Sequence, residues 1–595
     1  MEEVLVEKKI NTKSLGFFII LPIMSLIQIS NITYGSDILK LSLLLFSTLI
    51  TLFLYRSLFV IKNIFQLVPL LLILIYLINQ FFLGNDLTSF ILGTHNRFGG
   101  FITLISLAIL FIITSNQGQE GKKLFHNSLY ITYVFMLTNG LMTYLGVFSN
   151  DTYFDANERI VKSSSDLSLT FGNPNIASAF LGISISFHMC LIISKAYKNN
   201  YVQGIILFIG LFILIQTNSI QGLLILVFNI LIMLLYYYKK NYSNFSLRYK
   251  IFTLSLSLLL FLSFIINFRF IWNFLYVSGN IEARINYWKT SIRIWNEFKL
   301  TGVGLDNLGQ VATFYRDFEL AKQEGLWTIP DRTHNVPLDH LVNGGILAFV
   351  LWIVFIGVTT ILAFRKIFRK IGVASPVIDF SVCLIWFGYL FQSLISVDHI
   401  FLTLIGYLSA GLIFGDYLYE RNNHKSYGKR FVPFFLVAQI TLVGFMINQL
   451  ILSYNVNQFL NRGNTQVLDK IYNTRFIEQQ SFLDTVVKLS GDKQFKLAAL
   501  FSEKLLIVNP YAHQAYYAKS VFYESEKDLI KAKREMEKAH TYDKFNSVYT
   551  LSLGIYEYNL KNYPKAYYWL TETAKLNPTQ QGIEILKNSL DQLDS

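Results

Sequence analysis

Charged residues are scarce in this chain. Asp, Glu, Lys and Arg make up 15% of its 595 residues, whereas ordinary soluble proteins carry about a quarter. Cysteine is nearly absent as well: Cys190 and Cys383 are the only two, and both lie inside apolar runs. The first shortage excludes an ordinary soluble protein. The second argues against a disulfide framework or a thiolate metal site.

Long apolar runs fill most of the first three quarters of the chain. Hydrophobic residues make up 53% of the sequence, and many runs reach the roughly 20 residues that a helix needs to cross a bilayer. We therefore predict an all-α transmembrane bundle of about 13 spans. The spans are expected near residues 15–30, 38–55, 64–83, 98–115, 124–147, 176–194, 202–217, 220–238, 251–268, 345–364, 376–395, 400–418 and 431–451. The first run lacks a small-residue cleavage site, which favours a retained span over a signal peptide.

Basic residues produce a net charge of +13, and they gather in alternate short loops between the apolar runs. That alternation is typical of membrane topology and argues against nucleic acid as a partner. Placing the basic loops in the cytoplasm puts the N-terminus inside. The long loop at 269–344 and the C-terminal tail from residue 453 are then predicted to lie outside the cytoplasm.

The tail carries a repeat with a period of 34 residues. Two sets of residues recur at this interval: Ala498, Ala532 and Ala566, and Asn509, Asp543 and Asn577. Paired helices with this period are typical of tetratricopeptide repeats, an α-solenoid whose concave surface binds peptide or protein. We expect a transmembrane domain at 1–452, a linker at 453–478 and repeats at 479–595. The alternative is a helical array without a partner of its own.

The long outer loop contains an amphipathic helix pattern at 282–298. Its apolar positions recur at three- and four-residue spacing: Ile285, Trp288, Ile292 and Trp295. Tryptophan is typical of the membrane–water interface. Arg284 flanks this apolar face. Its guanidinium either grips phosphate through two parallel hydrogen bonds or extends from the interface into solvent.

His334 and Asn335 end this loop, shortly before the apolar run at 345–364. Pro337 beside them is typical of the first turn of a helix. The helix dipole lowers the pKa of a histidine at that end and favours the neutral imidazole that a general base needs. A histidine that caps the helix by bonding to backbone is the alternative.

Four further polar residues lie at the predicted outer ends of spans, where a charge is costly without a partner. They are Arg97, Asn173, Asn175 and Asp398. Each of them either contacts a substrate or anchors the end of its span.

Several of these elements together resemble one family. They are Phe171-Gly172-Asn173-Pro174-Asn175, Arg284 with Trp288, Gly302-Val303-Gly304, and His334-Asn335 with nine residues before Gly345. In this combination residues 15–420 are similar to the O-antigen ligase and O-antigen polymerase superfamily. The sequence departs from the family at Ser219-Ile220-Gln221-Gly222, where members often show Ser-Arg-Gly, and in its thirteenth predicted span and repeat tail.

The resemblance implies a membrane glycosyltransferase of the C-type class, which works at the outer face of the bacterial cytoplasmic membrane without a metal or cofactor. Its donor would be a glycan on a polyprenyl diphosphate, and its acceptor a lipid or a protein. By analogy, His334 would be the base, and Arg284 and Arg97 would hold the diphosphate. Further contacts with diphosphate or glycan are assigned to Asn335, Asn173, Asn175 and Asp398.

The resemblance leaves several functions open. Ligation of a finished glycan and polymerisation of repeat units share the same motif, and the repeat tail weakly favours ligation. A transporter or flippase predicts charged or broken helices at mid-membrane, and Asp379 is the nearest such acid. A membrane-anchored scaffold would use only the tail, and it leaves the long loop with its arginine and histidine unexplained.

Overall fold

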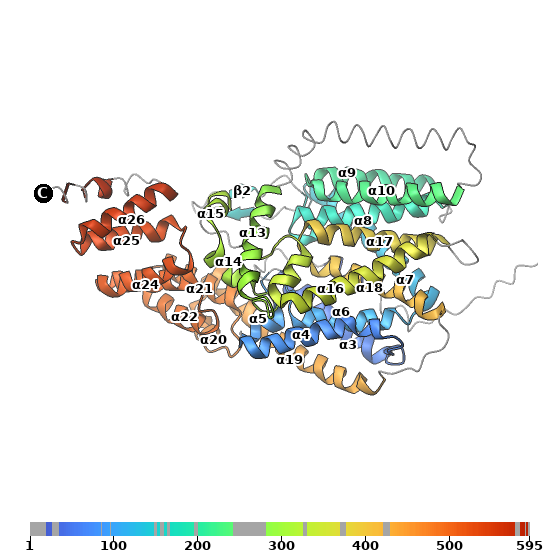
Figure 1. Cartoon of the computed structure of the whole chain (residues 1–595), viewed down its shortest axis with the longest axis horizontal. Helices are drawn as coiled ribbons and strands as arrows, with labels where there is room; N and C mark the ends of the chain where they lie inside the picture. The colour runs from blue at the N-terminus through green and yellow to red at the C-terminus, as the bar shows by residue number, and fades with distance from the viewer. Residues whose placement is uncertain are drawn as a thin grey trace, which may run out of the picture.

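The computed structural model describes residues 20–26, 35–84, 86–95, 97–147, 152–154, 160–162, 167–194, 200–241, 281–324, 330–368, 376–420, 429–577, 584–588 and 591–592. These residues are helical almost throughout (Figure 1). Among their helices and strands, one antiparallel hairpin, of β1 (Thr152–Phe154) and β2 (Ile160–Lys162), is the exception. The predicted all-α class is therefore right apart from this short hairpin.

Eight helices in the described part of the chain are long and apolar enough to cross a membrane. They are α3 (Gly35–Leu54), η1 with α4 (Ile64–Leu67 and Val68–Leu83), α8 (Pro174–Ile193), α10 (Ile220–Asn241), α16 (Val336–Phe368), α17 (Pro376–Ile395), α18 (Ile400–Glu420) and α19 (Val432–Arg462). All eight coincide with predicted spans. The chain is a multi-pass membrane protein.

The remaining five predicted spans are not shown as such. Helices α6 (Phe101–Thr114) and α9 (Asn200–Gln216) are apolar but short. At 1.5 Å per residue, α6 covers about 21 Å of a hydrocarbon core about 30 Å thick. Helix α7 (Gly118–Tyr144) is long but polar in its first turns. Of the first span only α2 (Ile20–Leu26) is described, and 251–268 lies outside the described residues.

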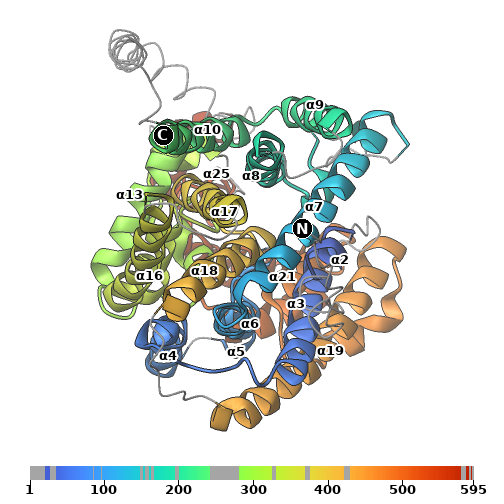
Figure 2. The same ribbon diagram turned by 90° about the vertical axis from the view of Figure 1, so that its right-hand side faces the viewer.

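The bundle is built around buried helices. Seen along its length in Figure 2, α17 and α18 lie inside, and α4, α7, α9, α10 and α16 lie around them. Helices α8 and α10 approach closely because Gly182 and Gly222 lie at their contact: a Cβ at Gly182 would meet the backbone of Gly222. Small residues of this kind let transmembrane helices pack backbone to backbone. Gly222 therefore has a packing role in the segment that departs from the family pattern.

The long loop contains three helices at one end of the bundle: α13 (Ile281–Glu297), α14 (Leu308–Tyr315) and α15 (Phe318–Glu324). The predicted amphipathic helix at 282–298 is confirmed as α13. The fully buried face of α13 contains Tyr287, Thr290 and Ile294. Of the predicted apolar stripe, Ile292 is exposed, whereas Trp288 and Trp295 are partly buried and pack against the protein. The indoles lie beside that buried face.

The tail is a row of helical hairpins. The pairs are α21 (Gln479–Gly491) with α22 (Phe495–Val508), α23 (His513–Ser525) with α24 (Leu529–Tyr542), and α25 (Ser547–Asn559) with α26 (Tyr563–Leu576). They begin at 479, 513 and 547, at the predicted 34-residue interval. The recurring alanines of the second helices are fully buried, as close packing of the pairs requires. Their assignment to tetratricopeptide repeats stays a prediction.

The tail packs on the long loop of its own chain. Arg316, which follows α14, donates to Asp543 Oδ1 from Nε at 3.1 Å and from Nη2 at 2.6 Å, and both side chains are buried. Phe314 also contacts Tyr542, with ring centroids 6.4 Å apart. Figure 1 shows the loop helices between the bundle and the tail. Loop and tail therefore lie on the same side of any membrane that the bundle crosses.

Candidate active site

Asn335 sets the position of the loop that carries His334. Its Oδ1 accepts a hydrogen bond from Leu338 N at 3.0 Å, and its Nδ2 donates to Leu394 O at 2.8 Å. The first bond caps α16, since an Asn side chain satisfies an amide of the first turn. The second bond ties this cap to the end of α17. Both ends of the amide are thus bonded to backbone, and the contact of Asn335 with substrate stays a prediction.

Three glycines explain the spacing of the family motif. Gly345 interrupts α16 with φ +69°, and Gly302 and Gly304 have φ +63° and +104°. The turn at 299–304 lies against the interruption through three backbone hydrogen bonds, from Val303 N to Val342 O, Gly304 N to Asn343 O and Ile346 N to Lys299 O, at 2.9–3.0 Å. A Cβ at Gly345 would overlap the Leu300 carbonyl. Glycine is required because the backbones touch and φ is positive.

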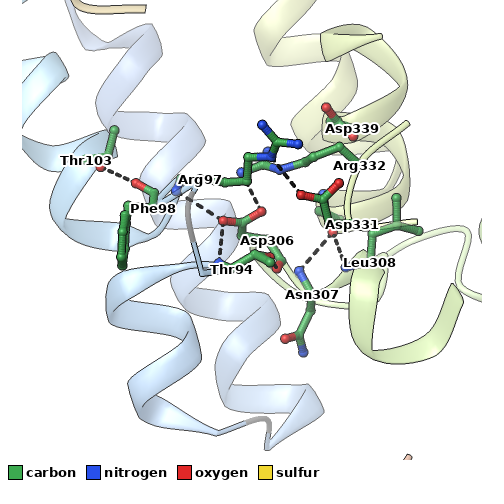
Figure 3. A network of polar contacts seen from close by, with 12 residues as sticks. Thr94, Arg97, Phe98, Thr103, Asp306, Asn307, Leu308, Asp331, Arg332 and Asp339 are labelled. Atoms are coloured by element: carbon green, nitrogen blue, oxygen red, sulfur yellow. Dashed lines mark hydrogen bonds and ion pairs between the residues drawn. The ribbon is translucent and has the colours of Figure 1, made fainter. Parts of the chain in front are cut away.

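A network of ion pairs joins this loop to the end of α5 (Leu87–Leu92) and the start of α6 (Figure 3). Arg97 Nε lies 2.7 Å from Asp331, and Arg332 Nη2 lies 2.6 Å from Asp306. The other oxygen of Asp306 accepts from the amides of Thr94 at 2.7 Å and Gly99 at 3.1 Å. The network holds two segments more than 200 residues apart in one geometry.

Burial and charge act against each other in this network. Burial raises the pKa of Asp306 although Arg332 opposes it. For Arg332 itself burial lowers the pKa, but the surrounding carboxylates, Asp306 first, outweigh burial and raise it. Burial also raises the pKa of Asp331, yet Arg97 and the other nearby cations leave it below its ordinary value. Arg332 therefore stays charged, with its guanidinium held by carboxylates.

His334 lies beside this network and is neutral. Its ring stacks on Tyr287 of α13, with centroids 5.1 Å apart and planes 9° from parallel. Burial lowers the pKa of His334 to about 4, Arg284 and Arg97 act in the same direction, and Asp331 opposes them. The sequence predicts a neutral imidazole from the helix dipole, whereas in the structure burial is the larger cause.

Arg284 is the second basic group near His334. It is half-buried, and burial lowers its pKa. Among the described residues it makes no ion pair. A half-buried guanidinium without a carboxylate partner is a place where an anionic ligand gains charge-assisted hydrogen bonds.

A small cavity of about 50 Å³ lies on the bundle side of the network. Arg97, Arg332, Asp339, His340 and Asp398 are among the residues that line it. Burial raises the pKa of Asp398 to about 7, with Arg332 opposing. The structure thus brings Arg97 and Asp398 to one cavity, and it brings Arg97 close enough to His334 to lower the pKa of that imidazole.

Residues 205–353 match the family described as O-antigen ligase. The chain carries an O-antigen ligase domain. The matched segment includes both Arg284 and His334, and no curated protein matches the chain. This domain implies a membrane glycosyltransferase-like enzyme.

The remaining predicted site residues, Asn173 and Asn175, lie before the matched segment and form a separate cluster. Asn173 caps α8, and its Oδ1 accepts from Asn175 N at 2.8 Å. Asn175 Oδ1 accepts from Ser219 Oγ at 2.7 Å, which ties α8 to the start of α10. An Asn–Pro pair at this position is typical of a helix start. These hydrogen bonds are structural, and contact of either residue with glycan stays a prediction.

Sequence reasoning missed several residues of the ligase site. Arg332 lies two positions before His334, Asp306 lies two positions after Gly304, and Tyr287 was assigned no role. A signal existed for the first two, since each places a charge directly beside a family motif. Their pairing with each other was not readable, because they lie 26 positions apart in the loop.

Proposed function

We propose that this enzyme transfers a glycan from a polyprenyl diphosphate to a lipid or protein acceptor, at the outer face of the bacterial cytoplasmic membrane and without a metal. The O-antigen ligase match supports lipid-linked glycan as the substrate class. Contact between the long loop and the tail agrees with the predicted topology, in which both lie outside. The N-terminus is then inside.

One observation carries the proposal. The neutral imidazole of His334 stacks on Tyr287 of α13, and Arg284, which makes no ion pair with a described residue, lies three positions earlier on the same helix and lowers the pKa of His334. A neutral imidazole can accept a proton, and an unpaired guanidinium can hold an anion. Glycosyl transfer from a diphosphate requires both functions at one place.

The residues would act as follows. His334 takes the proton of the acceptor hydroxyl as its oxygen bonds to the anomeric carbon. The bond from that carbon to the diphosphate oxygen breaks at the same time, and the electron pair leaves with the polyprenyl diphosphate. Arg284 and Arg97 face the negative charge that develops, which stabilises the transition state. A single displacement of this kind inverts the anomeric configuration.

The test uses His334→Ala and Arg284→Ala in cells that make the chain's own glycan. Mass spectrometry follows lipid-linked and transferred glycan. Loss of a general base lowers the transfer rate by roughly 10²- to 10⁴-fold, so lipid-linked glycan should accumulate. The matched control is Arg293→Ala, because Arg293 lies on the same helix, is 43% exposed and pairs with Asp317 at 2.6 Å.

Unchanged transfer in a well-expressed double variant of His334 and Arg284 would contradict the catalytic assignment. The length of the transferred glycan separates two reactions within the proposal. A finished glycan joined to a new acceptor indicates ligation, whereas loss of long lipid-linked chains in the variants indicates polymerisation.

A further inference from the structure

A larger cleft lies on the tail side of the ion-pair network. It has a volume of about 500 Å³, and its walls come from the ligase domain and from the first helices of the tail. Its lining residues include Gln310 and Asp331 from the loop, and Gln480, Asp484, Asn509 and Gln514 from the tail. Ligand sites commonly have volumes of roughly 300–1,000 Å³. The cleft is therefore large enough for an organic ligand.

The walls of the cleft are fixed by contacts between the two parts of the chain. Gln479 Nε2 donates to Ser89 Oγ at 2.8 Å, and Asn509 Nδ2 donates to Gln479 Oε1 at 3.1 Å. His95 Nδ1 lies 3.7 Å from Glu478. These contacts join the tail to the end of α5 and the turn after it. The cleft is thus a built site and not a loose gap between two parts.

The lining chemistry selects against phosphate. The side chains around the cleft are carboxylates, amides, one histidine and small or aliphatic groups, and none of the lining residues is Lys or Arg. Carboxylates accept hydrogen bonds, and amides both donate and accept. A sugar hydroxyl also donates and accepts, so a saccharide can satisfy both kinds of group. The negative charge of the lining carboxylates favours uncharged sugars and amino sugars over acidic sugars.

Two lining residues are available to a ligand. Gln514, at the start of α23, makes no hydrogen bond with its side chain to any described residue. Asp484 makes one, from Gln480 Nε2 at 2.8 Å. Burial raises the pKa of Asp484 to about 7, so this carboxyl can donate as well as accept. Both residues lie on the tail, which the matched family segment does not include.

The cleft borders the candidate active site. Asp306 lines both the cleft and the small cavity on the bundle side. Asp331 lines the cleft, pairs with Arg97, and stands three residues before His334. A chain of sugars in the cleft would therefore end near the imidazole that takes the acceptor proton.

We propose that this cleft binds the saccharide chain of a substrate, and that uncharged sugars or amino sugars of that chain occupy it. This inference rests on the proposed transfer function. It assigns the tail a role in substrate binding within the same chain. The saccharide belongs either to the lipid-linked donor or to the acceptor, and the two sources are separated by the experiment below.

The experiment places a photoreactive benzoylphenylalanine at Gln514 of the full chain, in cells that make its own glycan. Illumination should produce an adduct that reacts with a periodate–hydrazide carbohydrate stain. The matched control is the same replacement at Gln466, which is exposed and lies on the tail outside the cleft. An adduct that carries a polyprenyl diphosphate identifies the donor, and one without it identifies the acceptor.

A blocking variant supplies an independent readout. Gln514→Trp fills the cleft without removing a described hydrogen bond, whereas Gln466→Trp adds the same indole elsewhere. Losing one or two hydrogen bonds to a sugar corresponds to about a tenfold change in binding. We expect Gln514→Trp to raise the KM for the saccharide substrate by about that factor and to leave kcat unchanged.

The outcomes separate this inference from the proposed function. Transfer that is lost in His334→Ala, with no carbohydrate adduct at Gln514 and normal KM in Gln514→Trp, overturns the cleft alone. Transfer that persists in His334→Ala, with no lipid-linked glycan accumulating, overturns the proposed function instead. A carbohydrate adduct at Gln514 that also forms in His334→Ala supports the cleft, because binding does not need the base.

Discussion

Replacing Arg316 by alanine should release the tail from the loop of the ligase domain. Arg316 donates two hydrogen bonds to Asp543, from Nε at 3.1 Å and Nη2 at 2.6 Å, and the two side chains are only 1% and 0% exposed. Asp543 also accepts from Asn546 at 3.2 Å. The substitution therefore leaves the Asp543 carboxylate buried without its cationic partner, held only by neutral donors, the side chain of Asn546 and the backbone of Phe545.

Removing one partner of a buried ion pair costs about 3–5 kcal/mol. If this cost weakens only the packing of the tail on the loop, the population of molecules with a released tail rises by more than about a hundredfold. The direction of the pH dependence follows from Asp543. Burial raises the pKa of this carboxyl, although Arg316 opposes the shift. A raised pKa in the folded state means that stability is lost as pH rises through it. Without Arg316 this pKa rises further, so the variant should lose more at pH 8 than at pH 5.

Hydrogen exchange on the full chain measures the effect. In Arg316→Ala the amides of α14 and α24 should exchange faster, and the difference should shrink on going from pH 8 to pH 5 after correction for intrinsic rates. The double variant Arg316→Met with Asp543→Asn removes both charges and should recover most of the protection. Arg293→Ala is the control, because its exposed pair is worth about 1 kcal/mol at most. Unchanged exchange at pH 8 in Arg316→Ala would refute the reasoning.

Three further predictions concern the site. Arg284→Ala removes a positive charge near His334 and should raise the pKa of that imidazole above about 4. The acid limb of the kcat/KM profile then moves to higher pH. Arg284→Lys keeps the charge, so an acid limb that moves equally in both variants argues against this cause. Asp306→Asn removes the ion-pair partner of the buried Arg332 and leaves only the more weakly acting Asp339, Asp331 and Asp398 to offset its charge, which should cost up to about 3–5 kcal/mol in thermal unfolding. An unchanged midpoint would show that the pair is dispensable. Gly345→Ala should lower stability by more than about 1 kcal/mol because the φ of Gly345 is +69°. The control Gly357→Ala, in the same helix and with open space around it, should be neutral or slightly stabilising. Equal expression and stability of the two variants would contradict the argument.

Much of the fold was readable from the chain because its signals are local. A transmembrane span is about 20 consecutive apolar residues, and eight predicted spans coincide with helices of the structure. The amphipathic period placed α13, and the 34-residue interval placed the three hairpins of the tail. The family motif was readable too, because Gly302, Gly304 and Gly345 each serve a backbone requirement that no other residue meets without strain.

The partners of the polar side chains could not be read in this way. Asn173, Asn175 and Asn335 have the same sequence signature as ligand-binding residues, but in the structure they cap helices and tie them together. A side-chain amide bonds equally well to a backbone group and to a sugar. Only the tertiary arrangement shows which groups lie within hydrogen-bonding distance.

The sequence by itself determined the class of this protein: a multi-pass helical membrane chain with an O-antigen ligase domain and a helical tail. Local periodicity and composition carry that information. The tertiary structure decided that the tail packs on the chain's own loop, since Arg316 and Asp543 are 227 residues apart. It also decided that burial makes His334 neutral and that Arg284 lacks a carboxylate partner among the described residues. Burial and pairing depend on what distant segments place around a side chain, and no local pattern encodes them.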